Sequence, residues 1–266
     1  MVSSGGSQIQ AGGALYIFDD DPRSVTVTMT IVNTTYGFIF IHIPKTGGTS
    51  VKEHLRDYCR EGDVHINLRS GAEPSRSVGR FRVRKHSTAR VVCKVVGRAE
   101  YDRLFKFCVV RNPFIRTLSL FRFLKFNFRS WQRSEVMDEL HTLEEFVTTP
   151  LFASAGPGGI ISPQVHWLTG ESGENGMDYI ARVERIEQDL SEIKARLGLP
   201  PSPKPLLRRN ASKGDAENFI AGLMSDKVVD AVRTRYASDF SMLGYSTDPG
   251  DAMGLEQATK FGLYAR

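Results

Sequence analysis

Hydrophobic and polar positions near the N-terminus follow a period of two. Between Ser24 and Val32, valine, methionine and isoleucine alternate with threonine, as in a strand with one buried and one exposed face. The apolar segment LYIF lies just before Asp19–Pro22, where an Asp-Pro sequence is typical of a turn. An antiparallel N-terminal β-hairpin is therefore expected.

Two later stretches each predict a buried strand, a loop and a helix. Residues 37–43 (GFIFIHI) are apolar with little alternation, which favours a strand buried on both faces. After the loop Pro44–Ser50, apolar side chains recur on one face of a helix, at Val51, Leu55, Tyr58 and Cys59. The second unit consists of the strand FKFCVV from Phe105, an Asn-Pro turn, and a largely apolar helix from about Phe114 to Phe128.

The remainder of the chain alternates loops with shorter elements. Residues 148–177 are rich in glycine, proline and serine and predict a long irregular loop, which in proteins is commonly functional. A strand near 179–183 leads into a helix over 186–197, and Ser225 is a good N-cap for a last helix to about Phe240. This order of elements predicts an α/β fold, with a flexible leader at 1–13, a single domain at 14–245 and a tail at 246–266.

Composition adds a charge asymmetry to this fold prediction. The 266 residues carry a formal net charge of +5, yet residues 69–133 hold seventeen basic side chains against three acidic ones. Such a basic middle of the chain suggests an anionic partner there. By itself the charge admits a nucleic acid, a membrane surface or an acidic small ligand.

Targeting signals and cysteines restrict the class of protein further. No basic residue precedes Arg23, so a signal peptide's charged region is missing, and no apolar run approaches the ~18–20 residues that span a bilayer. The three cysteines have neither zinc-ligand spacing nor the even number of a disulfide framework, and the apolar runs around Cys93 and Cys108 predict buried thiols. We expect a soluble, cytoplasmic protein without membrane insertion or a metal site.

The loop Pro44–Ser50 (PKTGGTS) has the chemistry of a phosphate-binding turn. Gly47 and Gly48 let successive backbone N–H groups point toward an anion, and the following helix adds the positive end of its dipole. Lys45 supplies a mobile charge, and hydroxyl donors come from Thr46, Thr49 and Ser50. The lysine precedes the glycines, so this is not a Walker A loop, and an uncommitted tight turn is the alternative interpretation.

A second candidate site follows the second buried strand. Arg111 lies at the carboxyl end of that strand, where open α/β sheets bind ligands, and Ser119 lies about two turns into the next helix. A guanidinium beside a hydroxyl suits a terminal phosphate. An arginine paired with a carboxylate and a serine bonded to its own helix would explain the same residues equally well.

The two segments together resemble the cofactor motifs of a known enzyme family. PKTGGTS after one buried strand and VRNPFIRTLSLF after another are similar to the motif pair of sulfotransferases that use 3′-phosphoadenosine-5′-phosphosulfate (PAPS). Over residues 37–245 the chain most resembles the carbohydrate sulfotransferases, a group with heparan sulfate 2-O- and chondroitin-type enzymes and bacterial relatives. The resemblance implies a P-loop-like three-layer fold with a central, mainly parallel sheet, to which the N-terminal β-hairpin is added. It also implies that a sulfuryl group moves from PAPS to a hydroxyl, with adenosine 3′,5′-bisphosphate as product and no metal.

The resemblance assigns roles to individual residues. The 5′-phosphosulfate would be held by Lys45, Thr46, Gly47, Gly48, Thr49 and Ser50, and the 3′-phosphate by Arg111 and Ser119. Lys45 would also stabilise the transferred group and the leaving phosphate, as an oxyanion-hole donor does. Residues 207–214 (LRRNASKG) are more loosely similar to the family's adenosine loop, with Arg209, Ser212 and Lys213 as candidates, and a solvated basic loop is the alternative.

A general base must take the proton of the acceptor hydroxyl. Of the six histidines, His86 lies between the two motifs in KHSTA, a segment that resembles the one carrying the base in this family. His166 in PQVHW and the carboxylate of Glu53 are the other candidates. His42 lies inside the buried strand and is expected to pack there.

By the same resemblance the acceptor is expected to be a saccharide. Gln164, His166 and Trp167 in the long loop are candidate contacts, because an amide beside an aromatic face suits a sugar. For Trp167, packing of the indole into the core is the favoured interpretation. The basic stripe Arg122, Lys125 and Arg129 would either flank an anionic acceptor or lie in solvent.

Two alternative functions remain open at this stage. A P-loop-type nucleotide kinase or NTPase is disfavoured, because the lysine is misplaced and no strand ends in an aspartate that would hold magnesium. A basic nucleic-acid-binding module is disfavoured because the aromatic residues of the basic region fall in buried patterns, so binding of nucleic acid is not expected. The sequence does not indicate an oligomeric state.

Overall fold

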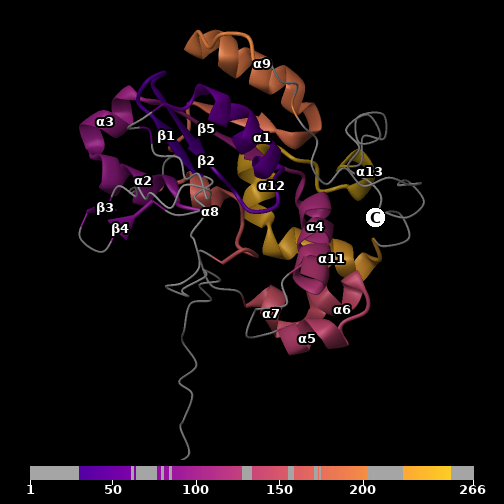
Figure 1. Ribbon diagram of the computed structural model, residues 1–266. Helices are drawn as coiled ribbons and strands as arrows, with labels where there is room; N and C mark the ends of the chain where they lie inside the picture. The colour runs from indigo at the N-terminus through magenta and orange to yellow at the C-terminus, as the bar shows by residue number, and fades with distance from the viewer. Residues whose placement is uncertain are drawn as a thin grey trace, which may run out of the picture.

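The fold is organised around a four-stranded sheet, seen in the computed structural model of Figure 1. The structure describes residues 30–60, 63, 77–78, 81–83, 86–127, 134–154, 159–170, 173, 175–202, 206 and 224–252. The sheet has the order β1 (Ile31–Asn33), β2 (Phe38–Ile41), β5 (Phe105–Val110) and β6 (Tyr179–Arg182). β2, β5 and β6 are parallel, whereas β1 pairs antiparallel with β2. The mainly parallel sheet is confirmed. Its antiparallel hairpin joins Ile31–Asn33 to Phe38–Ile41, whereas the predicted hairpin paired LYIF with residues 24–32, and LYIF and residues 24–29 lie outside the described residues.

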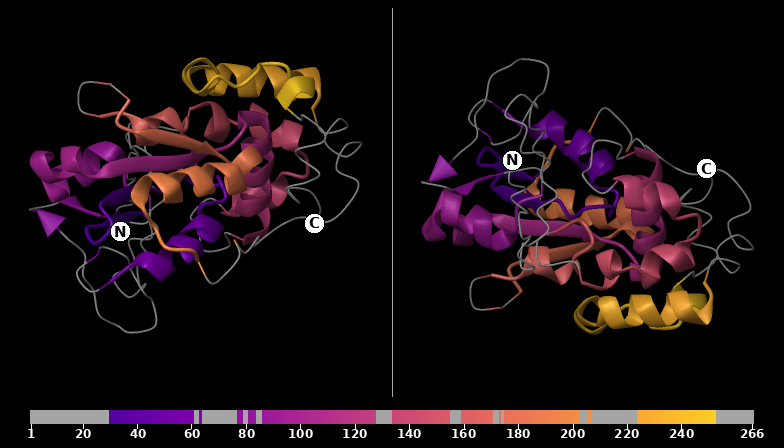
Figure 2. Two further views of the ribbon diagram at one scale, coloured as in Figure 1. Left: turned by 90° about the horizontal axis from the view of Figure 1, so that it is seen from above. Right: turned by 90° about the horizontal axis from the view of Figure 1, so that it is seen from below.

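Strand side chains alternate between two helical layers, as the pleat requires. On one face, Phe38, Phe40 and Phe107 pack against α1 (Gly48–Leu55), the 3₁₀ turn η1 (Arg56–Tyr58) and α9 (Ile186–Leu197). On the other face, Ile39, Ile41, Cys108 and Val110 pack against a second set of helices. These are α2 (Ala89–Val96), α3 (Arg98–Arg103), α8 (Val165–Leu168) and α12 (Ala237–Leu243). The two views of Figure 2 place α1 and α12 on opposite sides of the strands, so the fold has the predicted three layers.

A helical cluster continues from the end of β5. The long apolar helix predicted there is α4 (Pro113–Asn127), which buries Phe114, Leu118 and Phe121. It packs with α5 (Ser134–Glu139), α6 (Leu143–Thr148), α7 (Pro150–Ala153) and α11 (Asp226–Arg235). The remaining short elements are β3 (Ser77–Val78), β4 (Phe81–Arg82), η2 (Val183–Arg185) and α13 (Pro249–Ala252).

Several details go beyond the pattern of the sequence or differ from it. The run VVCKVV, to which no element was assigned, is helix α2, because Thr88 caps its N-terminus and Ala89, Val92 and Val95 form one buried face. The predicted long loop contains α7 and α8. The predicted last helix is interrupted at Tyr236, whose buried ring lies between α11 and α12 and whose hydroxyl donates to the carbonyl of Ile161. Cys108 is buried as predicted, but Cys93 is only partly buried.

Candidate active site

The predicted phosphate loop joins β2 directly to α1. The Thr46 hydroxyl is buried and donates to the Ile43 carbonyl at 3.0 Å, and the Ser50 N–H donates to the Gly47 carbonyl at 3.1 Å. Lys45 has a φ of 66°, a left-handed conformation that costs a non-glycine residue about 1–2 kcal/mol. Strained backbone of this kind is concentrated at ligand-binding turns. The loop is therefore a closely curled turn held by its own hydrogen bonds.

The two adjacent glycines of the loop are required for different reasons. Gly47 has a φ of 72°, a conformation that suits glycine. Gly48 is constrained by its surroundings, because a Cβ there would lie 1.8 Å from Cδ2 of His42. Glycine at position 48 therefore leaves room for the imidazole of His42, which was expected only to pack inside the buried strand.

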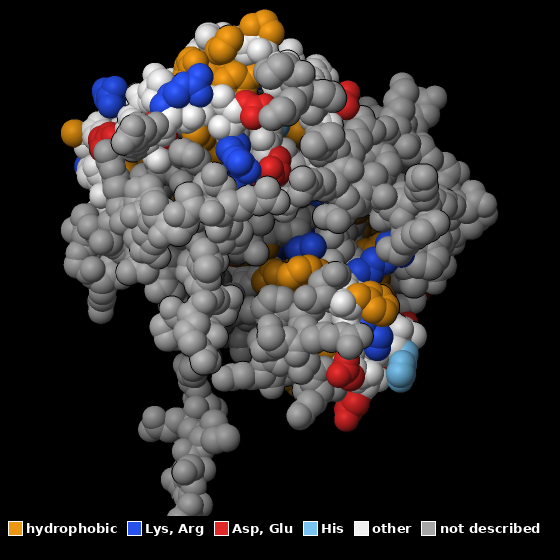
Figure 3. All heavy atoms as spheres, viewed as in Figure 1, with side chains coloured by type: hydrophobic (Ala, Val, Ile, Leu, Met, Phe, Trp, Pro, Cys, Tyr) orange, Lys and Arg blue, Asp and Glu red, His pale blue; other side chains and the backbone are white. Residues whose placement is uncertain are grey.

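Lys45 and Arg111 bring the two predicted motifs together. The Lys45 ammonium lies 4.2 Å from the centre of the Phe123 ring on α4, a cation–π contact. Nη1 of Arg111 donates to the Lys45 carbonyl at 3.4 Å. The phosphate loop after β2 and the turn after β5 are therefore neighbours at the carboxyl edge of the parallel strands, where α/β sheets bind ligands. In Figure 3, basic and hydrophobic side chains lie together over the region of α4.

The turn at Arg111 is held through its backbone. The fully buried Gln164 accepts the Arg111 N–H through Oε1 and donates to the Arg111 carbonyl through Nε2, both at 2.8 Å. Glu184 accepts the Asn112 N–H at 2.7 Å, and the Asn112 side chain caps α4 by accepting the N–H of Phe114. Both ends of the Gln164 amide are thus bonded to the protein rather than directed to solvent.

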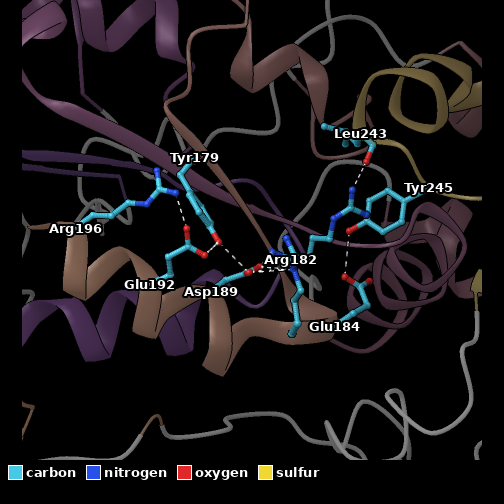
Figure 4. A network of polar contacts seen from close by, with 9 residues as sticks. Tyr179, Arg182, Glu184, Asp189, Glu192, Arg196, Leu243 and Tyr245 are labelled. Carbon is cyan, nitrogen blue, oxygen red and sulfur yellow. Dashed lines mark hydrogen bonds and ion pairs between the residues drawn. The ribbon is translucent and has the colours of Figure 1, made fainter.

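Two carboxylates, Asp239 and Glu184, support the turn at Arg111 by accepting hydrogen bonds. Asp239 accepts the backbone N–H groups of Gln164 and Val165 at 2.9 and 3.0 Å, and burial raises its pKa above the usual range. Glu184 also accepts the hydroxyl of Tyr245 at 3.1 Å, and the Arg182 guanidinium lies over that ring (Figure 4). Burial raises the pKa of Tyr245 well above its ordinary value, so the phenol stays a hydrogen-bond donor.

Arg116 on α4 is a buried arginine that the sequence analysis missed. It is 0% exposed, and its guanidinium donates to the carbonyls of Pro44, Ser162 and Ile160 at 3.0–3.1 Å. It also lies 5.7 Å from the Trp167 ring centre. Arg116 therefore ties the first residue of the phosphate loop to the segment 160–162, which no local pattern in the sequence could indicate.

His86 lies directly against His42. Their Nδ1 atoms are 2.8 Å apart, the rings are stacked with centres 4.5 Å apart, and Nδ1 of His86 is also 3.1 Å from the His42 carbonyl oxygen. The buried indole of Trp167 donates to the His86 carbonyl at 3.2 Å, so this side chain is packed in the core as favoured. The predicted base is thus anchored on both its ring and its backbone.

The other predicted candidates are placed differently. His166 is half-buried beside the Trp167 ring, and desolvation lowers its pKa. Glu53 on α1 forms ion pairs with Lys52 and Arg56. Ser119 is partly buried in α4. Arg209, Ser212 and Lys213 lie outside the described residues.

The basic stripe of α4 is divided among different environments. The Lys125 ammonium donates to carbonyls at the end of α5, including that of Leu140, so it joins two helices. Arg122 is partly buried, and desolvation lowers its pKa. Arg129 lies outside the described residues.

Comparison with known proteins identifies the family of the chain. A model of the sulfotransferase family matches residues 28–246, which is most of the chain, and the protein belongs to that family. It is therefore an enzyme that transfers a sulfuryl group, and its family implies PAPS as the donor. No curated protein and no solved structure gave a match. Within the part of the chain that the structure describes, no helix combines the length and apolar character needed to cross a membrane.

Proposed function

We propose that this enzyme transfers the sulfuryl group of PAPS to a hydroxyl of a saccharide, with Lys45 and His86 as catalytic residues and no metal ion. The observation that carries the proposal is the convergence of three segments on one edge of the sheet. The loop after β2, the turn after β5 and the segment of His86 are joined by the Arg111–Lys45 and His86–His42 contacts. Membership of the sulfotransferase family supports this function over the kinase and nucleic-acid alternatives.

The described residues fit the donor nucleotide. The curled backbone from Lys45 to Thr49, with Gly48 too crowded for any side chain, would offer N–H groups and the start of helix α1 to a phosphosulfate. Arg111 and Ser119 would hold the 3′-phosphate, since a guanidinium recognises a phosphate through paired donors. Arg209, Ser212 and Lys213 would contact the adenosine.

The chemistry requires charge stabilisation and one proton transfer. PAPS, when bound, supplies a sulfuryl group attached to a phosphate leaving group. The Lys45 ammonium would leave the Phe123 ring and stabilise negative charge on the transferred group and the leaving phosphate. His86 would accept the proton of the acceptor hydroxyl at Nε2, a contribution of about 10²–10⁴-fold in rate.

The long loop supplies the acceptor side of the site. Gln164 and Trp167 are buried and bonded to Arg111 and His86, so we propose that they act on the acceptor through the residues that they position. His166, next to Trp167 and half-buried, is the side chain proposed to contact the sugar.

The proposal is tested by nucleotide binding in a metal-free buffer. Adenosine 3′,5′-bisphosphate with EDTA should raise the melting temperature, because a ligand at 100 times its Kd stabilises by about 2.7 kcal/mol, or roughly 5–10 °C for a domain of this size. Arg111→Met is the matched binding-site variant and should lose half or more of the shift at the same concentration. No shift at millimolar nucleotide, or a shift with ATP and magnesium alone, would contradict the proposal.

A further inference from the structure

His42 occupies the space between the phosphate loop and the predicted base. One edge of its ring lies against Gly48, where a Cβ would come within 2.1 Å of Nε2. The face of the ring stacks on His86, with the two planes 23° apart. His42 is 4% exposed, so both contacts lie in the interior of the protein. The imidazole of His42 therefore contacts both the phosphate loop and the predicted base His86.

The contacts of His86 decide where its proton lies. Nδ1 of His86 is within hydrogen-bonding distance of two atoms of His42, the ring Nδ1 at 2.8 Å and the carbonyl oxygen at 3.1 Å. A carbonyl oxygen only accepts hydrogen bonds, whereas an imidazole nitrogen donates or accepts according to its tautomer. A proton on Nδ1 of His86 would face two acceptors. Without a proton on Nδ1, the lone pair of this His86 nitrogen would face the lone pairs of the His42 carbonyl oxygen.

We propose that His42 is a positioning residue that holds His86 in the tautomer with the proton on Nδ1. In this tautomer Nε2 of His86 carries the lone pair and is the atom that accepts the proton of the acceptor hydroxyl. Nδ1 of His42 accepts from His86, so the proton of His42 is on its own Nε2, toward Gly48. The hydrogen bond of one ring nitrogen selects the tautomer of a histidine in this way.

The inference rests on the proposed role of His86 but makes a separate physical claim. Trp167 fixes the backbone of His86 by donating to its carbonyl, and this contact is independent of the ring. The contact between the two histidines involves the ring of His86, which lies against both the ring and the carbonyl of His42. Loss of the His42 ring nitrogen should therefore change turnover while nucleotide binding at the phosphate loop persists.

Two substitutions separate the ring nitrogen from the volume of the side chain. His42→Phe keeps a ring of similar shape without an acceptor, and His42→Asn places an amide oxygen close to the position of Nδ1. We expect kcat of His42→Phe to fall about 10–100-fold, the range found when a hydrogen bond that orients a metal-bound histidine is lost, with KM for PAPS unchanged. His42→Asn should recover most of that loss.

Nitrogen-15 NMR of histidine-labelled protein provides the readout that packing alone would not change. In the wild type, His86, assigned by the signals missing from His86→Ala, should carry its proton on Nδ1. In His42→Phe only the main-chain carbonyl of residue 42 remains to accept from Nδ1, so part of the His86 population should shift toward the Nε2-protonated form, and His42→Asn should restore the wild-type tautomer.

Several outcomes would overturn the inference. A wild-type His86 with its proton on Nε2 would do so even if His42→Phe failed to fold. An unchanged kcat in His42→Phe, or equal losses in the Phe and Asn variants with an unchanged tautomer, would do the same. Failure of the proposed function looks different, because His86→Ala would then keep its turnover whatever the tautomer measured in the wild type.

Discussion

The two ends of strand β5 carry basic side chains that are equally buried but are held in different ways. Lys106 at the amino end is 9% exposed, and Arg111 just past the carboxyl end is 8% exposed. The Lys106 ammonium lies 2.8 Å from the Asp178 carboxylate and donates to the Leu104 carbonyl at 2.8 Å. Arg111 is fixed through its backbone by both ends of the Gln164 amide.

The difference shows how one strand serves both stability and chemistry. At the amino end, the charge of Lys106 is neutralised by the carboxylate of Asp178 at the same edge of the sheet. This ion pair therefore has a structural role. A cavity of about 130 Å³ also lies there, lined in part by Cys93, Tyr101 and Lys106. At the carboxyl end, the backbone of the turn is held by both ends of the Gln164 amide, which is the condition for presenting a side chain accurately.

The largest effect that this comparison predicts is on turnover at the carboxyl end. His86→Ala should lower kcat about 10²–10⁴-fold, because the proton of the acceptor hydroxyl loses its base, while the Kd of adenosine 3′,5′-bisphosphate stays unchanged. Sulfate transfer from labelled PAPS and calorimetric titration of the nucleotide measure the two quantities.

His141→Ala is the matched control, since His141 is exposed at the start of α6 and lies in no motif. It should keep wild-type turnover. Equal losses in the two variants would mean that the base lies elsewhere.

Removal of the buried guanidinium of Arg116 should have the next largest effect, on stability. Arg116→Met leaves the carbonyls of Pro44, Ser162 and Ile160 without their donor, and an unsatisfied buried group costs about 1–3 kcal/mol. We expect the free energy of unfolding to fall by about 3 kcal/mol in total, measured by urea denaturation.

Arg122→Met on the same helix provides the comparison, because that side chain is only partly buried. Its effect should stay within about 1 kcal/mol. If Arg116→Met were as mild, the link between the phosphate loop and residues 160–162 would be dispensable.

Replacement of each basic residue by methionine, at one end of β5 at a time, tests the comparison of the two ends directly. Arg111→Met should raise the Kd of adenosine 3′,5′-bisphosphate about 10–100-fold, because a hydrogen bond to a charged group contributes about 1.5–3 kcal/mol. Lys106→Met should leave that Kd unchanged and lower the free energy of unfolding by about 1 kcal/mol, a modest amount because Asp178 is partly exposed. A loss of nucleotide affinity in Lys106→Met would abolish the distinction between the two ends.

The sequence predicted the elements whose signal is local. The strands at residues 38–41 and 105–110 and the helix at 186–197 were found because uninterrupted apolar runs and a closing Gly198 specify them within a few residues. The curled loop at Lys45 was likewise indicated by its glycines. These features depend on neighbours in the chain.

The features that the sequence could not indicate depend on distant partners. In the sequence, Arg116 cannot be distinguished from the other basic residues of its region. Its burial is explained by hydrogen bonds to the carbonyls of three residues that are distant in the chain. Gln164 was a candidate sugar contact because an amide beside an aromatic face suits a sugar, and nothing local in the sequence shows its bonds to Arg111. His42 and His86 are 44 residues apart, so their contact exists only in the folded chain.

A smaller effect at the carboxyl end depends on pH. The pKa of Asp239 is raised by burial, so between the unfolded value of about 3.9 and the higher folded value the folded state binds more protons. The contribution of Asp239 to the free energy of unfolding should therefore decrease as pH rises through this window. Compared with Asp239→Asn at each pH, the wild type should lose part of its advantage with rising pH, and an advantage that grows would contradict the assignment.

The smallest effect separates two hydroxyls of helix α4. Ser119→Ala should raise the Kd of adenosine 3′,5′-bisphosphate about fivefold, because one hydrogen bond of about 1 kcal/mol to the 3′-phosphate is lost. Thr117, two residues earlier, is buried and its hydroxyl donates to the Pro113 carbonyl at 2.7 Å, so Thr117→Val should leave the nucleotide Kd unchanged. If Ser119→Ala also leaves the Kd unchanged while Arg111→Met does not, the 3′-phosphate is recognised by the guanidinium without this hydroxyl. The carboxyl end of β5 would then bind its ligand through the turn alone.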